Sequence, residues 1–283
     1  MKAKKIKVNK TALTIWILAL VLLLILSLII PGREKEETIK EVMKDGVLHE
    51  FGRISLFGIK DVNPAYISSS IVVLVLLFFA LLVRIFAFPK FKLIPGKFQS
   101  LIEMAVGFGS NLAKSNSPHK NGILGAYIFA AAAYIFFGTL FELFGVQAVT
   151  VFGASISLPA PLSDINAAIA MGVTSYLFIM SGGISSNGLK GVGLTLKEFS
   201  LPISMSFRLF GALLSGLLVT ELVYYWITLS FVLPVLVGIM FTLLHALIQT
   251  YVLTMLTAVY YGEVSEPQTK KNKKSQPKLQ AEN

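Results

Sequence analysis

An arginine lies in the middle of an apolar segment towards the end of the chain. Arg208 belongs to SMSFRLFGALLSGLL, and the nearest charged residues along the chain are Glu198 and Glu221. A charge at the centre of a bilayer costs from ~3 to more than 10 kcal/mol, depending on the method. No carboxylate lies within one helical turn, so we expect the partner of Arg208 to come from another helix or another protein. The alternative is that Arg208 lies near a helix end and extends its guanidinium to the membrane surface.

Small residues follow Arg208 one and two helical turns further along the chain, namely Gly211, Ala212, Ser215 and Gly216. Small side chains on a helix let a second helix approach closely. A guanidinium beside such a face indicates a docking surface for a carboxylate that a partner supplies. Close packing within this chain explains the glycines equally well.

Three more polar residues lie in the last apolar segments: Glu221, His245 and Gln249. His245 and Gln249 are four residues apart, so they share one face of a helix. Glu221 follows Arg208 by 13 residues, which at 100° per residue places it on a largely different face. Histidine and glutamate relay protons in membrane proteins, so these residues favour a proton path. A hydrogen-bonded structural role for His245 is the alternative.

Polar residues also mark the edges of two earlier apolar segments. Asp164 and Asn166 open one of them in PLSDINAAIA, and Glu142 lies near the outer end of another. The three side chains are candidates to face one external vestibule. The alternative for Asp164 and Asn166 is helix capping, since Asp and Asn are good N-caps and an acid suits the helix dipole there.

The composition of the chain predicts the elements that must position these residues. Hydrophobic residues make up 55% of 283 positions and charged residues only 14%, well below the charge of a soluble domain. The apolar residues form blocks of about twenty, which is the length of a membrane-spanning helix. Runs such as VVLVLLFFALLV do not alternate as barrel strands do. We therefore expect an all-α, polytopic membrane protein.

About six spans are expected from the apolar blocks. Four of them cover residues 11–30, 66–88, 123–145 and 164–181. The last block, 200–262, is too long for one span and predicts a hairpin of two long, tilted helices.

The same pattern divides the chain into four parts. Residues 1–30 form a basic tail and an extra transmembrane helix, for which a cleaved signal peptide is the alternative. Residues 31–65 form an external loop, 66–262 the membrane domain, and 263–283 a charged cytoplasmic tail. An even number of spans places both termini in the cytoplasm.

The sequence also predicts the structure of the segments between the spans. The glycine-rich stretch SGGISSNGLKGVG (181–193) is expected to break the helix and turn, and residues 146–163 to form an external loop. The basic segment after the second span is expected on the cytoplasmic side, with LIEMAVGFGSNLA as a short helix along the interface.

Several classes of site are not expected. The chain has no cysteine, which excludes disulfides, thiolate nucleophiles and cysteine metal sites. The net charge of +10 lies in loops and tails, where it sets membrane orientation rather than binding nucleic acid. We expect neither a cofactor nor a bound metal.

Four stretches of the sequence resemble one family. RLFGALLSG (208–216) is similar to the arginine motif of subunit a of the rotary, F-type ATP synthase, usually written RLFGNxxxG. ALIQTYVLTMLTAVYYGEVSE (246–266) resembles the last helix of that family, including its glutamine. PLSDIN (161–166) and GKFQSLIEM (96–104) resemble two further segments of it. The resemblance covers roughly residues 55–266.

The resemblance implies a subunit of the Fo sector that is not an enzyme on its own. It would lie in a cell membrane, with a bacterial plasma membrane expected, and couple ion flow to ATP synthesis by the whole complex. Its partners would be the ring of c-subunits, the subunit b peripheral stalk, the rest of the complex and the lipid bilayer. The transported ion would be the proton, or sodium in a variant of the same machine.

The resemblance also implies roles for individual residues. Arg208 would face the carboxylates of the c-ring, hold each one ionised and block ion leakage, while Gln249 positions the arginine. Two half-channels would bring ions to the ring, and their candidate residues are Glu221, His245, Asp164, Asn166 and Glu142.

The sequence departs from the family pattern at three positions. Ala212 stands where the arginine motif has asparagine. Leu217 and Thr242 stand where the family often has glutamate or histidine. Glu221 and His245 lie about one turn beyond these two positions, so we expect both polar groups to have moved one turn while still lining a half-channel.

Two other classes of protein compete with this interpretation. A secondary transporter would use Arg208 to bind an anionic substrate, but such proteins commonly contain internal repeats, and none is visible in the sequence. A purely structural membrane subunit would not need an arginine at membrane depth.

Overall fold

The computed structural model describes residues 54–56, 59–149, 155–225 and 233–267, together with 14–19, 21–22 and single residues at 25, 151 and 153. Most of the predicted first span and external loop, and the tail beyond residue 267, lie outside the described residues. The described part is almost entirely helical, and the prediction of an all-α, polytopic membrane protein is confirmed.

The described elements follow one another in a simple order. They are β1 (Ile54–Leu56), β2 (Ile59–Val62), α3 (Pro64–Leu82), the π-helical turn η1 (Val83–Ala87), the 3-10 turn η2 (Phe88–Lys90), α4 (Lys97–Asn116), α5 (Gly122–Leu140), the 3-10 turn η3 (Phe141–Phe144), β3 (Gln147–Val149), β4 (Ser155–Ser157), the 3-10 turn η4 (Pro161–Ser163), α6 (Ile165–Asn187), α7 (Leu189–Lys197), α8 (Ser200–Tyr225) and α9 (Leu233–Ser265).

Four helices of the described part are long and apolar enough to cross a membrane: 64–90, 122–144, 165–187 and 235–265. A fifth span is formed if α7 and the first part of α8, which are bent by 51° at a short break, count as one crossing. These five correspond to five of the six predicted spans. The remaining one, at the N-terminus, lies largely outside the described residues.

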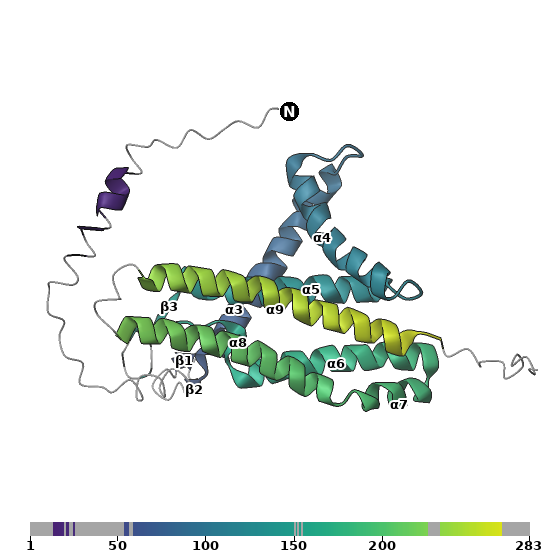
Figure 1. The fold of residues 1–283 in the computed structure, drawn as a ribbon. Coiled ribbons are helices and arrows are strands. Elements are labelled where there is room, and N and C mark those ends of the chain that lie inside the picture. The colour runs from purple at the N-terminus through teal and green to yellow at the C-terminus, as the bar shows by residue number, and fades with distance from the viewer. Residues whose placement is uncertain are drawn as a thin grey trace, which may run out of the picture.

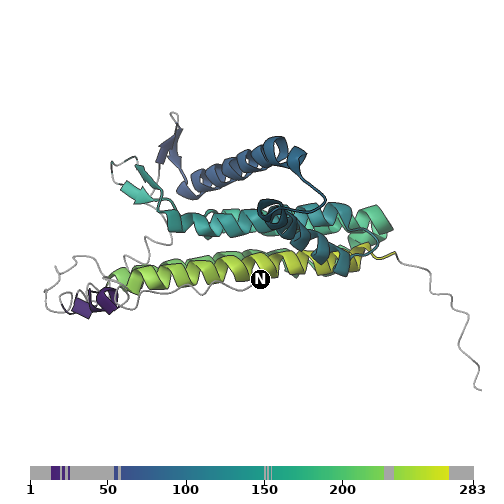
Figure 2. The ribbon, with the colours of Figure 1, turned by 90° about the horizontal axis from the view of Figure 1, so that it is seen from above.

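The spans pack in three layers (Figure 2). α3 forms one outer layer and touches α5. α5 and α6 form the middle layer, and α8 and α9 form the third, with α8 packed on α6 and α9 packed on both α5 and α6. The face of α8 and α9 that points away from the middle layer is therefore not covered by any other described helix.

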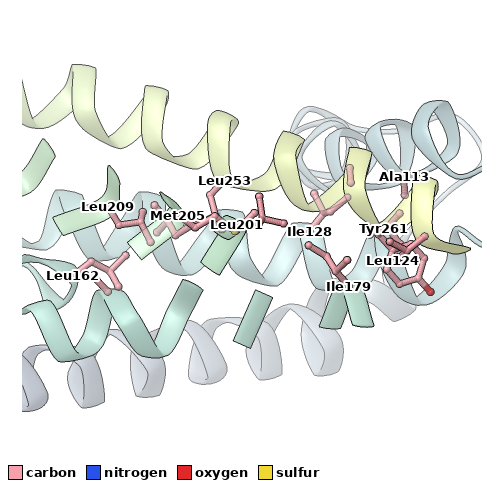
Figure 3. Close-up of a cluster of buried hydrophobic side chains, with 14 of the residues drawn as sticks. Ala113, Leu124, Ile128, Leu162, Ile179, Leu201, Met205, Leu209, Leu253 and Tyr261 are labelled. Carbon is pink, nitrogen blue, oxygen red and sulfur yellow. The ribbon is translucent and has the colours of Figure 1, made fainter. Parts of the chain in front are cut away.

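The core fills the space between the middle and third layers (Figure 3). Its fully buried side chains include Ile128 of α5, Ile179 of α6, Leu209 of α8 and Leu253 of α9. Interior apolar contacts in a membrane protein gain little from hydrophobic transfer, because lipid is as apolar as leucine. Close packing has to hold the layers together instead.

The glycine-rich stretch at residues 181–193 does not break the helix where the sequence predicted. α6 continues to Asn187, and the chain turns only at Gly188, whose φ of 58° lies in the left-handed region. A side chain on Gly182 would collide with the ring of Tyr261 in α9. These glycines therefore serve close packing of a continuous helix, and the prediction of a turn beginning at residue 181 is wrong.

The turn at Gly188 brings α7 back against the end of α6. Gly191 of α7 lies against the backbone of Gly183 and Ile184 in α6, and a Cβ on Gly191 would collide with it. Gly193, two residues further along α7, has open space around it. Two glycines of one short helix thus differ completely in their surroundings.

The connecting segments contain structure that the sequence did not predict. β1 pairs with β2 and β3 pairs with β4, each as a short antiparallel hairpin. The predicted helix after the second span is present as α4, which runs from the turn after α3 down to α5 (Figure 1). Its position along a membrane interface stays a prediction.

Candidate functional site

Arg208 lies beside the buried stripe of α8 and not in it. The stripe consists of Leu201, Met205, Leu209 and Leu213, which recur every four residues and face the middle layer. Arg208 is exposed. The apolar stripe of α8 therefore packs the helix against the bundle, while the guanidinium of Arg208 stays outside the protein core.

The exposed surface of α8 and α9 carries several large apolar side chains. Ile203 and Phe207 of α8 are more than half exposed, and so are Met240, Leu247 and Tyr251 of α9. Gly211 and Ser215, on the same helix as Arg208, are exposed too, and a Cβ on Gly211 would meet nothing within 4 Å. The small residues after Arg208 thus leave open room next to the guanidinium.

Gln249 of α9 contacts Arg208 through the backbone. Its Nε2 donates to the carbonyl oxygen of Arg208 at 3.3 Å, and its side chain is only 5% exposed. Gln249 Oε1 and the neighbouring Thr250 Oγ1 are buried without a hydrogen-bond partner among the described residues. The structure therefore brings the two predicted residues together, with the glutamine amide bound to the helix backbone rather than to the guanidinium.

His245 packs one turn before Gln249, against α8. An ideal Cβ on Gly216 would lie 3.3 Å from His245 Nδ1, so the glycine makes room for the imidazole. The imidazole ring also lies near the ring of Phe241, with the two ring centroids 5.7 Å apart. Glu221 belongs to α8, but its side chain lies outside the described part of the structure.

A separate cavity of about 430 Å³, lined by polar and apolar side chains, lies between α3, α5 and α6. Its polar lining comprises Asn63, Tyr66, Ser69, Tyr134, Asp164, Asn166 and Thr174. Ser69 and Tyr134 join α3 to α5 through a hydrogen bond of 2.8 Å between their hydroxyls. The cavity therefore brings together Asp164 and Asn166, two of the residues expected in the external vestibule.

Asp164 lines the cavity and accepts hydrogen bonds with both carboxylate oxygens. Oδ1 accepts from the backbone N–H groups of Asn166 and Ala167 and caps α6. Oδ2 accepts from Asn63 Nδ2 at 2.7 Å, and the Asn63 side chain caps α3 in turn. Asp164 is thus both an N-cap and a polar residue at the cavity, so the two interpretations of it do not exclude each other.

Glu142 does not join this group. It lies in η3, partly buried, and is not one of the residues that line the cavity. The structure accordingly separates Glu142 from the cavity that contains Asp164 and Asn166.

Five polar residues of the cavity were missed from the sequence: Asn63, Tyr66, Ser69, Tyr134 and Thr174. Asn63 had a usable signal, since an asparagine directly before a proline and an apolar run is typical of a helix N-cap. Ser69 and Tyr134 had none, because each lies within an apolar run and only the packing of α3 against α5 brings their hydroxyls together.

Comparison with known proteins finds relatives of this chain. Two similar proteins are ATP synthase subunit a of Histophilus somni strain 2336 and of strain 129Pt. Each is 28% identical over 206 residues, with 59% of this chain and 76% of the relative covered. The sequence model of the family described as ATP synthase A chain matches residues 67–262, which include every residue from α3 to α9 discussed above except Asn63 and Tyr66. The chain belongs to the ATP synthase A chain family.

Proposed function

We propose that this chain is the ion-translocating stator subunit of the membrane sector of an ATP synthase. Arg208 exchanges ions with carboxylates on a rotating ring of c-subunits, and Gln249 holds the helix turn that carries it. The observation that supports this most strongly is an arginine on the uncovered, apolar side of two membrane-spanning helices. Such a charge is costly in lipid, so a partner that brings a carboxylate to it explains its presence.

The apolar surroundings strengthen the proposed exchange. Two opposite charges about 4 Å apart attract with ~1 kcal/mol in water and ~4 kcal/mol at an effective dielectric constant of 20. Ile203, Phe207 and Leu247 exclude water beside Arg208 when a partner helix covers them. The guanidinium then keeps a carboxylate on the ring ionised while it passes, because a nearby cation favours the charged form.

Two paths would bring ions to and from the ring. The cavity of Asn63, Asp164 and Asn166 is a candidate for part of the external path, because it is roomy enough for water and has several polar side chains in its lining. Glu221 and His245 are proposed to line a half-channel at α8 and α9. Glu142 has no place in the cavity, and we retain it only as a candidate for the outer mouth.

The proposed complex includes the c-ring, the subunit b stalk and the remaining subunits, in a bacterial plasma membrane with both termini of this chain in the cytoplasm. The four-part division at residues 30, 65 and 262 remains part of this proposal. Protons are the proposed ion, with sodium as the alternative. Sodium stimulation of ATP hydrolysis by the whole complex distinguishes the two.

Purification of the tagged chain from its native membrane tests the proposal. We expect a ring of small, two-helix proteolipids to co-purify with the chain. We also expect the purified sample to hydrolyse ATP, with an activity that depends on the intact complex. A chain that purifies alone and transports an anionic solute in vesicles would support a secondary transporter instead and contradict the proposal.

The Glu221→Leu and His245→Leu variants test the proposed half-channel. We expect each to lower ATP-driven ion pumping by about ten-fold or more, because a positioned proton-transfer group typically contributes 10²–10⁴-fold. Pumping is measured in inverted membrane vesicles with a pH-sensitive dye. Matched controls are Leu222→Ala and Leu244→Ala at the neighbouring, exposed positions. Wild-type pumping rates in both Glu221→Leu and His245→Leu would contradict the hypothesis that these two polar side chains have moved by one turn and still line a half-channel.

A further inference from the structure

The turn between α3 and α4 is held in a defined shape by one buried side chain. Gln99, in the first turn of α4, is only 9% exposed. Its Oε1 accepts from the backbone N–H of Lys92 at 3.0 Å, and its Nε2 donates to the carbonyl of Lys92 at 2.8 Å. Nε2 also donates to Glu103 Oε1 at 2.7 Å. Residues 91–96 therefore form a braced loop, not an irregular linker.

The braced loop presents two apolar side chains outwards. Leu93 is 105% exposed, the highest value among the exposed large hydrophobic residues of the described part, and Ile94 is 88% exposed. The apolar surface continues onto α4, where Leu101 and Met104 are more than half exposed. Figure 1 shows α3 and α4 meeting in a V that projects away from the bundle of α5, α6, α8 and α9. The loop lies at this apex, far from the core.

Basic residues surround the apolar side chains. Four of them, all exposed, lie between residues 84 and 97: Arg84, Lys90, Lys92 and Lys97. The chain has no aspartate or glutamate between residues 62 and 102. Glu103, the first acid after the loop, is engaged by Gln99. The charged side chains from residue 84 to residue 97 are therefore all basic.

We propose that residues 90–97, which we name the loop anchor, bind anionic lipids of the membrane leaflet on their own side of the bilayer. Leu93 and Ile94 enter the apolar layer just below the headgroups, while Lys90, Lys92 and Lys97 contact lipid phosphates. Apolar side chains flanked by lysines are the pattern by which segments lie in an anionic membrane interface. The Gln99 brace fixes the loop in the orientation that allows both contacts at once.

The anchor also accounts for the geometry of α3. This helix is only 6% buried over its most apolar window, so the described part of the protein does little to hold it in place. An anchor at the end of α3, combined with the Asn63–Asp164 hydrogen bond at its start, fixes both ends of a span that protein packing leaves largely free.

A fluorescent probe tests the insertion of the loop. The chain has no cysteine, so Leu93→Cys provides a unique site for the environment-sensitive dye NBD on the full-length chain. The chain is placed in nanodiscs of phosphatidylcholine with phosphatidylglycerol. We expect a blue-shifted emission and quenching by lipids that carry a nitroxide on the acyl chain. The matched control is Glu266→Cys, an exposed position just beyond α9, which should show the emission of a probe in water.

Lysine substitutions test the lipid charge. The double variant Lys90→Gln with Lys92→Gln is compared with Lys114→Gln with Lys190→Gln, which removes two exposed lysines elsewhere. Each lysine near an anionic surface contributes roughly five-fold to binding. Lipids bound to the purified chain are measured by native mass spectrometry. We expect the ratio of bound phosphatidylglycerol to bound phosphatidylcholine to be at least about five-fold lower in the loop variant than in the wild type. The control variant should retain the wild-type ratio.

Two results would overturn the anchor. One is a probe at residue 93 that emits as the control probe does and is not quenched by nitroxide lipid. The other is an unchanged lipid ratio in the loop variant, measured in the same way as in the control variant. Neither measurement depends on ion pumping, so the anchor and the proposed function fail or succeed separately.

Discussion

Replacing Arg208 with alanine is expected to reduce ATP-driven ion pumping by at least about a hundred-fold, to the detection limit. An attraction of ~4 kcal/mol between Arg208 and a ring carboxylate corresponds to roughly a thousand-fold in the equilibrium between its charged and neutral forms. Without the guanidinium, an arriving carboxylate keeps its proton and does not release it. Pumping is measured in inverted vesicles from cells that express the variant as the sole source of the chain.

The structure supplies controls for this experiment. Ser204, one turn before Arg208 on α8, is also exposed, and Ser204→Ala should leave pumping within about two-fold of wild type. Because Gln249 holds the backbone and not the guanidinium, Arg208→Ala should leave the packing of α8 on α9 intact. The variant complex should therefore assemble in normal amounts. A variant that assembles and pumps at more than a tenth of the wild-type rate would contradict the proposed role of Arg208.

Replacing Gly191 with alanine is expected to destabilise the protein strongly. The new methyl group collides with the backbone of α6 at Gly183, and backbone cannot move aside as a flexible side chain can. Overpacking of this kind typically costs 1–3 kcal/mol, and a collision with backbone belongs at the upper end of that range. We expect a lower midpoint of thermal unfolding for the purified chain and a reduced amount of it in membranes.

Gly193→Ala is the matched control in the same helix. Nothing lies within 4 Å of the position that its Cβ would occupy, and alanine is favoured over glycine in a helix by up to about 1 kcal/mol. The unfolding midpoint of this variant should stay unchanged or rise. Equal midpoints for the two alanine variants would show that α7 does not pack on α6 as described.

The sequence predicted the spans well because a single physical constraint governs them. An apolar run of the length of α5 or α6 has no stable alternative to a helix across lipid. Arg208 was identifiable for the related reason that a charge within such a run is costly and needs an explanation. Both inferences use only the residue types along the chain and its local periodicity.

The errors lie where contacts between distant segments decide the structure. Gly182 and Gly183 look like helix breakers in the sequence, yet they lie inside α6 because Tyr261 and α7 occupy the space that side chains would need. The bond from Asn63 to Asp164 joins residues 101 positions apart, and no local pattern predicts it. The short hairpins β1–β2 and β3–β4 escaped prediction because each strand is only three or four residues long.

The site itself was predicted in part. The proximity of Gln249 to Arg208 came from the resemblance to a family and not from spacing, since 41 residues separate them. The contact with the Arg208 carbonyl was not predicted. A hydrogen bond to backbone leaves no trace in side-chain type at the accepting position, so the sequence gives no means of finding it.

The C-terminal end of α9 is held by side chains from two other segments. His119 Nε2 hydrogen-bonds to the carbonyl oxygen of Ser265, and Asn187 Nδ2 donates to the carbonyls of Val264 and Glu266. Hydrogen bonds therefore fix α9 at one end, and packing against α5 and α6 supports the rest of the helix. A force on the exposed face of α9 would be resisted by the middle layer behind it, so the helix would bend little. This stiffness would suit the proposed contact of the exposed face with a rotating ring of c-subunits.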